Sequence, residues 1–176
     1  ILLHIEFALS RARYSKWLDG VPAILDEKEN TLFDIKDFRH PLLVWNDFHE
    51  RKNTVVPISF DVPSDLKVVA ITGPNTGGKT VALKSIGLAV LMAKAGILLP
   101  CTGSPRLPWC KNVLADIGDE QSLQQNLSTF SGHILRISRI LDAIDSSNGT
   151  TLVLLDEVGA GTDPTEGTAL AMALLK

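Results

Sequence analysis

The residues best suited to chemistry in this sequence form a glycine-rich run that ends in lysine and threonine. The run reads Gly73-Pro74-Asn75-Thr76-Gly77-Gly78-Lys79-Thr80 and fits the pattern G-x-x-x-x-G-K-[ST]. Glycines let backbone N–H groups turn inward around phosphate oxygens, and a helix start adds its positive dipole end. We interpret the run as a phosphate-binding loop for ATP, in which Lys79 reaches the β and γ phosphates and the Thr80 hydroxyl ligates Mg²⁺.

Two carboxylates follow an apolar run late in the chain and extend this hypothesis. The run Thr151-Leu152-Val153-Leu154-Leu155 is typical of a strand buried on both faces, and Asp156 and Glu157 come directly after it. Asp156 would hold the Mg²⁺ shell, and Glu157 would orient or deprotonate the attacking water. The alternative is a pair of solvated acidic residues at a strand end, but the phosphate-binding loop upstream favours the catalytic interpretation.

The elements around these residues must bring the loop and the carboxylates to one edge of a sheet. The β-branched run Val68-Val69-Ala70-Ile71 stops before Gly73, and Lys79 to Lys94 has helical periodicity, so the loop is predicted to connect a strand to a helix. The chain further predicts strands at 113–117 and 151–155, and helices at 131–144 and from Pro164 or Thr165 onward. Strands alternating with helices predict an α/β fold with a largely parallel sheet.

The N-terminal part of the chain is predicted in less detail. Residues 1 to about 18 place apolar side chains near helical spacing, which predicts an amphipathic helix that ends at Gly20 and Pro22. The apolar positions of this helix are Leu2, Ile5, Leu9, Ala12 and Trp17. The stretch from Asp26 to Arg51 is charged and irregular, so short strands and loops are expected there.

Composition bounds the class of protein. With 176 residues, 45% of them hydrophobic and 21% charged, the chain can form one globular core. The net charge of −3 provides no basic face for a phosphodiester backbone, so any grip on DNA is expected from segments largely outside this sequence. The apolar stretches fall short of the ~18 to 20 residues of a membrane span, so no membrane partner is expected. Because the sequence begins at Ile1 and ends at Lys176 inside an apolar helical pattern, we interpret it as a fragment.

The motifs together resemble the MutS family of DNA-transacting ATPases. The phosphate-binding loop, the phrase Ser128-Thr129-Phe130, and Asp156-Glu157 followed by Gly161-Thr162 occur in the order and spacing of that family. Residues 116–122, 127–131 and 159–167 look like the second MutS branch, which lacks mismatch recognition and suppresses recombination. Asn126 stands where mismatch-repair members carry a glycine, which fits that branch. The resemblance covers about residues 36 to 176.

This resemblance implies a fold, a domain division and a shared site. The fold would be a phosphate-binding-loop NTPase of the ABC and MutS type, with residues 1–20 as the end of a lever helix and 21–176 as a truncated ATPase domain. The protein would be a homodimer in which Ser128 and Thr129 reach the γ-phosphate of the partner. By themselves these two residues look like an ordinary helix N-cap. Val55 would pack on the adenine, where mismatch-repair members have an aromatic residue.

The function expected from the resemblance is ATP hydrolysis coupled to binding of branched or recombining DNA, in DNA repair and recombination. One alternative is a member of the same branch that acts on ribosomes. Another is a transporter-type nucleotide-binding domain, which should carry a Leu-Ser-Gly-Gly-Gln-like phrase where this chain has Leu127-Ser128-Thr129-Phe130-Ser131. A third is a nucleotide-sensing dimerisation module that barely turns over. The expected compartment is the cytoplasm or an organelle such as a plastid.

Several other polar side chains have open roles. Cys101 and Cys110 are interpreted as two reduced thiols, with a redox latch as the alternative. His40 precedes Pro41 and is interpreted as a structural turn histidine. For His133 a dimer-interface role and a solvated or core-edge role are equally open. Arg136 and Arg139 are interpreted as exposed helix charges, and an arginine that acts in trans is the alternative.

Overall fold

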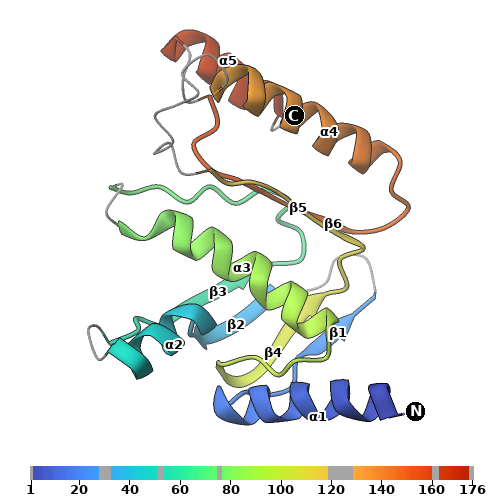
Figure 1. Cartoon of the computed structure of the whole chain (residues 1–176). Coiled ribbons are helices and arrows are strands. Elements are labelled where there is room, and N and C mark those ends of the chain that lie inside the picture. Colours follow the sequence, from blue (N-terminus) through green and yellow to red (C-terminus); the bar gives the residue numbers. More distant parts are fainter. Residues whose placement is uncertain are drawn as a thin grey trace. The chain divides into compact units, whose positions relative to one another are not determined.

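The computed structural model describes residues 2–27, 33–50, 54–74, 77–118, 129–159 and 163–174 (Figure 1). The chain divides into two compact units, Ile1–Trp109 and Cys110–Lys176. The glycine-rich loop belongs to the first unit, and the acidic pair after the late apolar run belongs to the second. No helix in the described ranges is both long and apolar enough to cross a lipid bilayer.

The first unit contains a four-stranded sheet with the order β1-β4-β2-β3. Its strands are β1 (Ile24–Asp26), β2 (Phe33–Phe38), β3 (Ile58–Val62) and β4 (Thr102–Pro108). β1 and β4 are parallel, but β2 runs antiparallel to both β3 and β4, so the prediction of a largely parallel sheet is wrong for this unit. Since Ile58 at the start of β3 lies opposite Phe38 at the end of β2, the intervening segment returns to the end of the sheet that it left.

That intervening segment holds helix α2 (Pro41–Glu50), which was not predicted from the sequence. His40 precedes the helix, and its carbonyl accepts the N–H of Val44 as the first helical hydrogen bond. Pro41 therefore occupies the first helical position, where its fixed φ and its missing N–H carry no cost. The region between Asp26 and Arg51 thus contains the inner strand β2 and helix α2, rather than short strands and loops alone.

The core of the first unit lies between its sheet and helix α3 (Lys79–Lys94), which Figure 1 shows running alongside the strands. Ile35 and Phe38 of β2 are both buried, although strict alternation would place them on opposite faces. An irregularity in the β2 ladder between these residues, with Asp37 at φ 53°, changes the alternation and turns Phe38 inward. The bounds of α3 confirm the predicted helix 79–94. Its small residues permit close packing, and Ala89 and Val90 are fully buried.

The run before the glycine-rich loop differs from its prediction. Residues 67–72 form neither a strand nor a helix, and Val68 and Val69 are about half exposed, at 47% and 54%. A β-branched run favours an extended backbone, but a strand is stabilised only when a neighbouring strand pairs with it and its apolar side chains are covered. The ladders of the described residues include no partner for this run, so the predicted strand is wrong in this structure.

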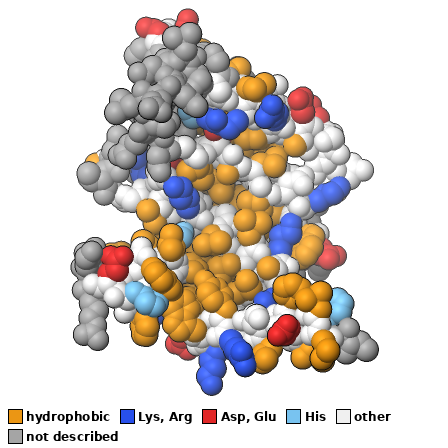
Figure 2. All heavy atoms as spheres, in the orientation of Figure 1, with side chains coloured by type: hydrophobic (Ala, Val, Ile, Leu, Met, Phe, Trp, Pro, Cys, Tyr) orange, Lys and Arg blue, Asp and Glu red, His pale blue; other side chains and the backbone are white. Residues whose placement is uncertain are grey.

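Helix α1 (Leu2–Trp17) confirms the predicted N-terminal helix but not its buried apolar face. Leu2, Ile5 and Leu9 are exposed, and the buried residue of the helix is Ser15. Its last turn holds the helix on the unit, because the Ser15 hydroxyl accepts the N–H of Leu98 at 3.0 Å. Figure 2 shows hydrophobic side chains (orange) gathered at the lower part of the view, where Figure 1 places α1 and α2.

The second unit pairs β5 (Asn112–Asp116) in parallel with β6 (Thr151–Leu155). The helices are α4 (Thr129–Asp145) and α5 (Pro164–Leu174). These elements confirm the predicted strands near 113–117 and 151–155 and the predicted helices near 131–144 and from Pro164. Since Asp116 lies opposite Leu155 in the parallel register, both strands end at the same edge of this small sheet.

Candidate functional site

The glycine-rich loop lies directly before the start of α3. Gly78 precedes the helix with φ 77° and ψ 18°, a left-handed conformation that glycine adopts without strain. The N–H of Gly77 donates to the carbonyl of Pro74 at 2.9 Å. A Cβ atom built on Gly78 would meet none of the described residues within 4 Å, so these residues leave the space in front of this backbone open to a ligand. Asn75 and Thr76 lie outside the described residues.

Lys79 is the first residue of α3, and its ammonium turns back over the loop. Its Nζ donates a hydrogen bond of 2.6 Å to the carbonyl of Gly73. This contact spans the loop from its last part to its first residue, and it holds a positive charge at the loop where an anion would bind. Thr80 follows in the first helical turn and is half-buried, which suits a hydroxyl that ligates a metal ion next to bound phosphates.

A pocket of about 460 Å³ opens beside this loop within the first unit. Its lining combines loop and α3 residues with α2 and the segment before β3, namely Leu43, Asn46, Asp47, Glu50, Thr54, Val55, Val56, Ile58, Gly77, Gly78, Val81 and Ala82. The volume is that of an ordinary small-ligand site, and apolar side chains with a few polar groups are the usual lining of such sites. The pocket thus brings Val55 to the same cavity as Gly77 and Gly78, and the packing of Val55 on an adenine stays a prediction.

The acidic pair follows β6 in the second unit. Asp156 is half-buried, and its N–H donates to the carbonyl of Asp116 at 3.0 Å, which extends the pairing of β6 with β5 by one step. Glu157 is exposed and has φ 49°, a left-handed conformation that is costly for a residue with a side chain. Strained backbone of this kind is concentrated at functional sites.

The loop after Glu157 is held by a close contact between two glycines. A Cβ atom on Gly159 would come within 2.6 Å of the Gly167 Cα, so only glycine fits there. Asp163 caps α5, because its carboxylate accepts the N–H of Thr165 at 2.9 Å. This hydrogen bond, with further ones from the Thr165 side chain and Glu166, lowers the pKa of Asp163. The loop after the acidic pair is thus tied to α5 at two places.

The two parts of the predicted metal site lie in different units. Thr80 belongs to the first unit and Asp156 to the second, so their joint ligation of Mg²⁺ stays a prediction. Ser128, predicted to act on the partner's nucleotide, lies outside the described residues. Thr129 is the first residue of α4, which agrees with the expected position of the Ser-Thr-Phe phrase at a helix start.

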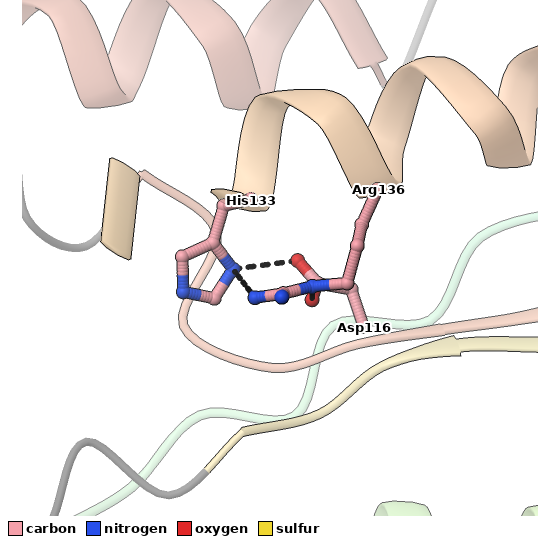
Figure 3. A network of polar contacts seen from close by, with 3 residues as sticks. All are labelled: Asp116, His133 and Arg136. Carbon is pink, nitrogen blue, oxygen red and sulfur yellow. Dashed lines mark hydrogen bonds and ion pairs between the residues drawn. The ribbon is translucent and has the colours of Figure 1, made fainter. Parts of the chain in front are cut away.

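A polar network at the end of β5 joins Asp116 to α4, and Figure 3 shows its members. Asp116 is buried, with 4% of its side chain exposed. His133 Nδ1 lies 2.6 Å from Asp116 Oδ2, and Arg136 Nε donates to Asp116 Oδ1. With its Nδ1 proton donated to Asp116, His133 has no lone pair there for Arg136 Nη2 at 3.4 Å, so we interpret that approach as packing. His133 therefore has a core-edge role within its own chain, and Arg136 is not a purely solvated charge.

His40 and the two cysteines contribute structure rather than reactive groups. Burial, and then the positive charge of Lys84, lowers the pKa of His40, which agrees with a structural turn histidine. Burial raises the pKa of the Cys101 thiol to about 11, while Arg39 lowers it and Asp37 raises it by smaller amounts. Cys101 therefore stays a thiol at neutral pH, in line with the reduced-thiol interpretation.

The α2 side of the pocket and the polar network at Asp116 were not predicted from the sequence. Pro41 after His40 is a recognisable helix start and could have revealed α2. His133 and Arg136 are three residues apart on one helix face, so they could have been predicted to share a partner. That partner, Asp116, is 17 residues from His133 in sequence, and nothing local identifies it.

Comparison with known proteins identifies the chain's relatives. The family described as MutS domain V matches residues 69–176. "Endonuclease MutS2" of Synechocystis sp. is 53% identical over 100% of this chain and 23% of that protein. "Endonuclease MutS2" of Symbiobacterium thermophilum is 50% identical over 98% of this chain, and that of Staphylococcus aureus is 46% identical over 99% of it. The chain spans only about a fifth of the length of these curated relatives.

Proposed function

This chain belongs to the MutS2 branch of the MutS family, and from that premise we propose that it binds and hydrolyses Mg²⁺-ATP as part of a homodimeric DNA-binding protein. The observation that carries the proposal is the pocket of about 460 Å³ whose lining includes Gly77 and Gly78 of the phosphate-binding loop. The proposed DNA substrate is branched or recombining rather than mismatched. The proposed compartment is the cytoplasm or an organelle.

The chemistry assigned to this chain is mainly positioning and charge neutralisation. The loop amides around Gly77 and Gly78 hold the phosphates, and Lys79 exchanges its hydrogen bond to the Gly73 carbonyl for phosphate oxygens. Bound Mg²⁺ would neutralise charge on the β and γ phosphates, with Thr80 and Asp156 as its protein ligands. Glu157 orients the attacking water and accepts its proton. Ser128 and Thr129 of the partner subunit would complete the site at the γ-phosphate.

Glu157→Gln in the full-length protein tests whether the chain is an enzyme or only a nucleotide sensor. The amide keeps the size of the side chain but cannot accept the proton, so turnover should fall by about 10²-fold or more while ATP affinity stays near that of the wild type. Steady-state turnover and calorimetric titration of Mg²⁺-ATP measure the two quantities. Equal, very slow turnover in both proteins would favour the nucleotide-sensing module.

Binding to a four-way DNA junction and to ribosomes tests the proposed target. The full-length protein, loaded with a slowly hydrolysed ATP analogue, should bind the junction more tightly than a linear duplex of the same length. Affinities compared at one salt concentration are required, because phosphate contacts make DNA binding strongly salt-dependent. Preference for ribosomes over every DNA would support the alternative target of the same branch.

A further inference from the structure

Asp116 holds two different elements of the second unit at once. Its carboxylate receives hydrogen bonds from His133 and Arg136, which lie in the first two turns or so of α4 (Figure 3). Its main-chain carbonyl accepts the N–H of Asp156, directly after β6. One residue therefore fixes α4 with its side chain and the end of β6 with its backbone.

The two elements held in this way carry most of the unit's predicted site residues. α4 starts at Thr129, next to Ser128, and the end of β6 leads into Asp156 and Glu157. The register of β5 with β6 places Asp116 opposite Leu155, the last residue before the acidic pair. A shift of Asp116 would thus reach the helix start and the acidic pair together.

A buried carboxylate joins α4 to β5 at the cost of a desolvation free energy that an apolar contact does not have. Asp116 is 4% exposed, and burial of a carboxylate requires partners that offset the loss of hydration. Apolar side chains, such as Ile137 of α4 and Leu154 of β6, are buried in the same unit without that loss of hydration. The charged contact adds directionality, because hydrogen bonds from two donors on one helix face restrict how the helix is oriented on Asp116.

We propose that Asp116, clamped by His133 and Arg136, is a positioning residue that keeps the start of α4 and the Asp156–Glu157 end of β6 in one fixed relation. This inference rests on the proposed ATPase function, in which α4 serves the partner's nucleotide and β6 serves the chain's own. The clamp then lets the two composite sites of the dimer reach their active geometry together. It affects turnover rather than the affinity of the phosphate-binding loop, which belongs to the other unit.

Three variants of the full-length protein test the clamp by kinetics: Asp116→Asn, Arg136→Gln and the double variant. Each single variant should lower kcat for Mg²⁺-ATP by about tenfold or more, with KM and the ATP dissociation constant unchanged, because small displacements of reacting groups cost rate. The double variant should be no worse than the poorer single one, since both remove the same interaction. Asp142→Asn, the same substitution at an exposed aspartate of α4, is the matched control and should behave as the wild type.

Two variants of His133 test whether its hydrogen bond to Asp116 is what matters. The amide nitrogen of asparagine can take the place of Nδ1, so His133→Asn should retain most of the activity, whereas His133→Leu should fall as far as Asp116→Asn. Additive losses in the double variant, a raised KM with unchanged kcat, or wild-type kinetics in Arg136→Gln would each overturn the proposal. If Asp116→Asn does not fold, the half-exposed Arg136 carries the test alone.

Hydrogen exchange separates a failure of the clamp from a failure of the proposed function. A wild-type protein that neither binds nor hydrolyses ATP would overturn the proposed function, and the clamp would then be judged by exchange alone. Arg136→Gln should speed amide exchange in the first turns of α4 and at Asp156, while exchange in α5 stays unchanged. Unchanged amide exchange both in the first turns of α4 and at Asp156 would overturn the clamp even where ATP hydrolysis is intact.

Discussion

Lys79 combines a structural contact with its proposed catalytic task. In the described structure its ammonium is bonded to the Gly73 carbonyl, within the loop that it would share with phosphates. An ammonium held there has little distance to travel when an anion enters, so part of its ordering cost is met before binding. The same side chain is only partly buried, which limits its contribution to folding.

Lys79→Ala should therefore lower ATP affinity and turnover by about 10²-fold or more without a measurable loss of stability. Calorimetric titration with Mg²⁺-ATP measures the affinity, and thermal unfolding without nucleotide measures the stability. Lys84→Ala, at an exposed lysine of the same helix, is the matched control and should bind ATP normally. Equal affinity in the two variants would count against the phosphate-binding role of the loop.

His40 links stability to pH. Burial and Lys84 lower its pKa below the ordinary value of 6.5, so the unfolded chain takes up the proton at a higher pH than the folded one. The free energy of unfolding should consequently fall as the pH drops below 6.5, and the fall should end once the pH passes below the folded-state pKa.

Urea unfolding of the wild type and His40→Gln on the two sides of pH 6.5 checks this expectation. The variant should lose less stability than the wild type on the acid side. His49→Gln, the same substitution at an exposed histidine in the last turn of α2, is the matched control. A wild-type protein whose urea midpoint is the same at both pH values would contradict a lowered pKa of His40.

At the scale of elements, the loop after β6 is held by a backbone contact at Gly159 in addition to the Asp163 cap of α5. Gly159 has φ 83°, and its Cα approaches the backbone of Gly167 in α5. A methyl group at this position would both strain the backbone and push the helix away. The acidic pair lies immediately before this contact, so the helix and the loop share one rigid attachment.

Gly159→Ala should lower the free energy of opening of α5 by about 1–3 kcal/mol, because the new Cβ overlaps Gly167. Hydrogen exchange of the α5 amides measures that free energy. Gly132→Ala provides the control, since its Cβ would lie at an ordinary 3.7 Å from Arg136 and alanine favours the helix. Comparable losses in both variants would show that the glycine contact carries no special weight.

For the whole molecule, the proposed active site needs two copies of the chain. The phosphate-binding loop belongs to one unit of one copy, and Ser128 and Thr129 would act on the partner's nucleotide. A symmetric dimer then contains two equivalent composite sites. Because both copies carry the same substitution, a change in the phosphate-binding loop or in Ser128 inactivates both sites.

Mixed dimers of Lys79→Ala with Ser128→Ala test this arrangement. Each variant alone should be nearly inactive, whereas a heterodimer retains one site built from an intact loop and an intact Ser128. Random mixing in equal amounts should restore about a quarter of the wild-type turnover, because half of the dimers are mixed and each has one working site. Turnover in the mixture no higher than in the separate variants would contradict a site shared between subunits.

The sequence by itself determined the features that depend on a few neighbouring residues. The glycine-rich pattern, the helix from Lys79 to Lys94, and the strand before Asp156 follow from backbone freedom, capping and periodicity, which act over a turn or two. The division between strand and loop at Val68–Ile71 did not follow, because a strand also needs a partner from elsewhere in the chain.

The tertiary structure alone decided which distant residues meet. It turned β2 antiparallel to β4, brought α2 and Val55 to one pocket with Gly78, and closed Asp116 on His133 and Arg136. Such contacts depend on burial and on the register of whole elements, and the same local pattern is compatible with many pairings until the core packs. The chemical groups were therefore readable from the sequence, while the contacts that orient them were set by packing.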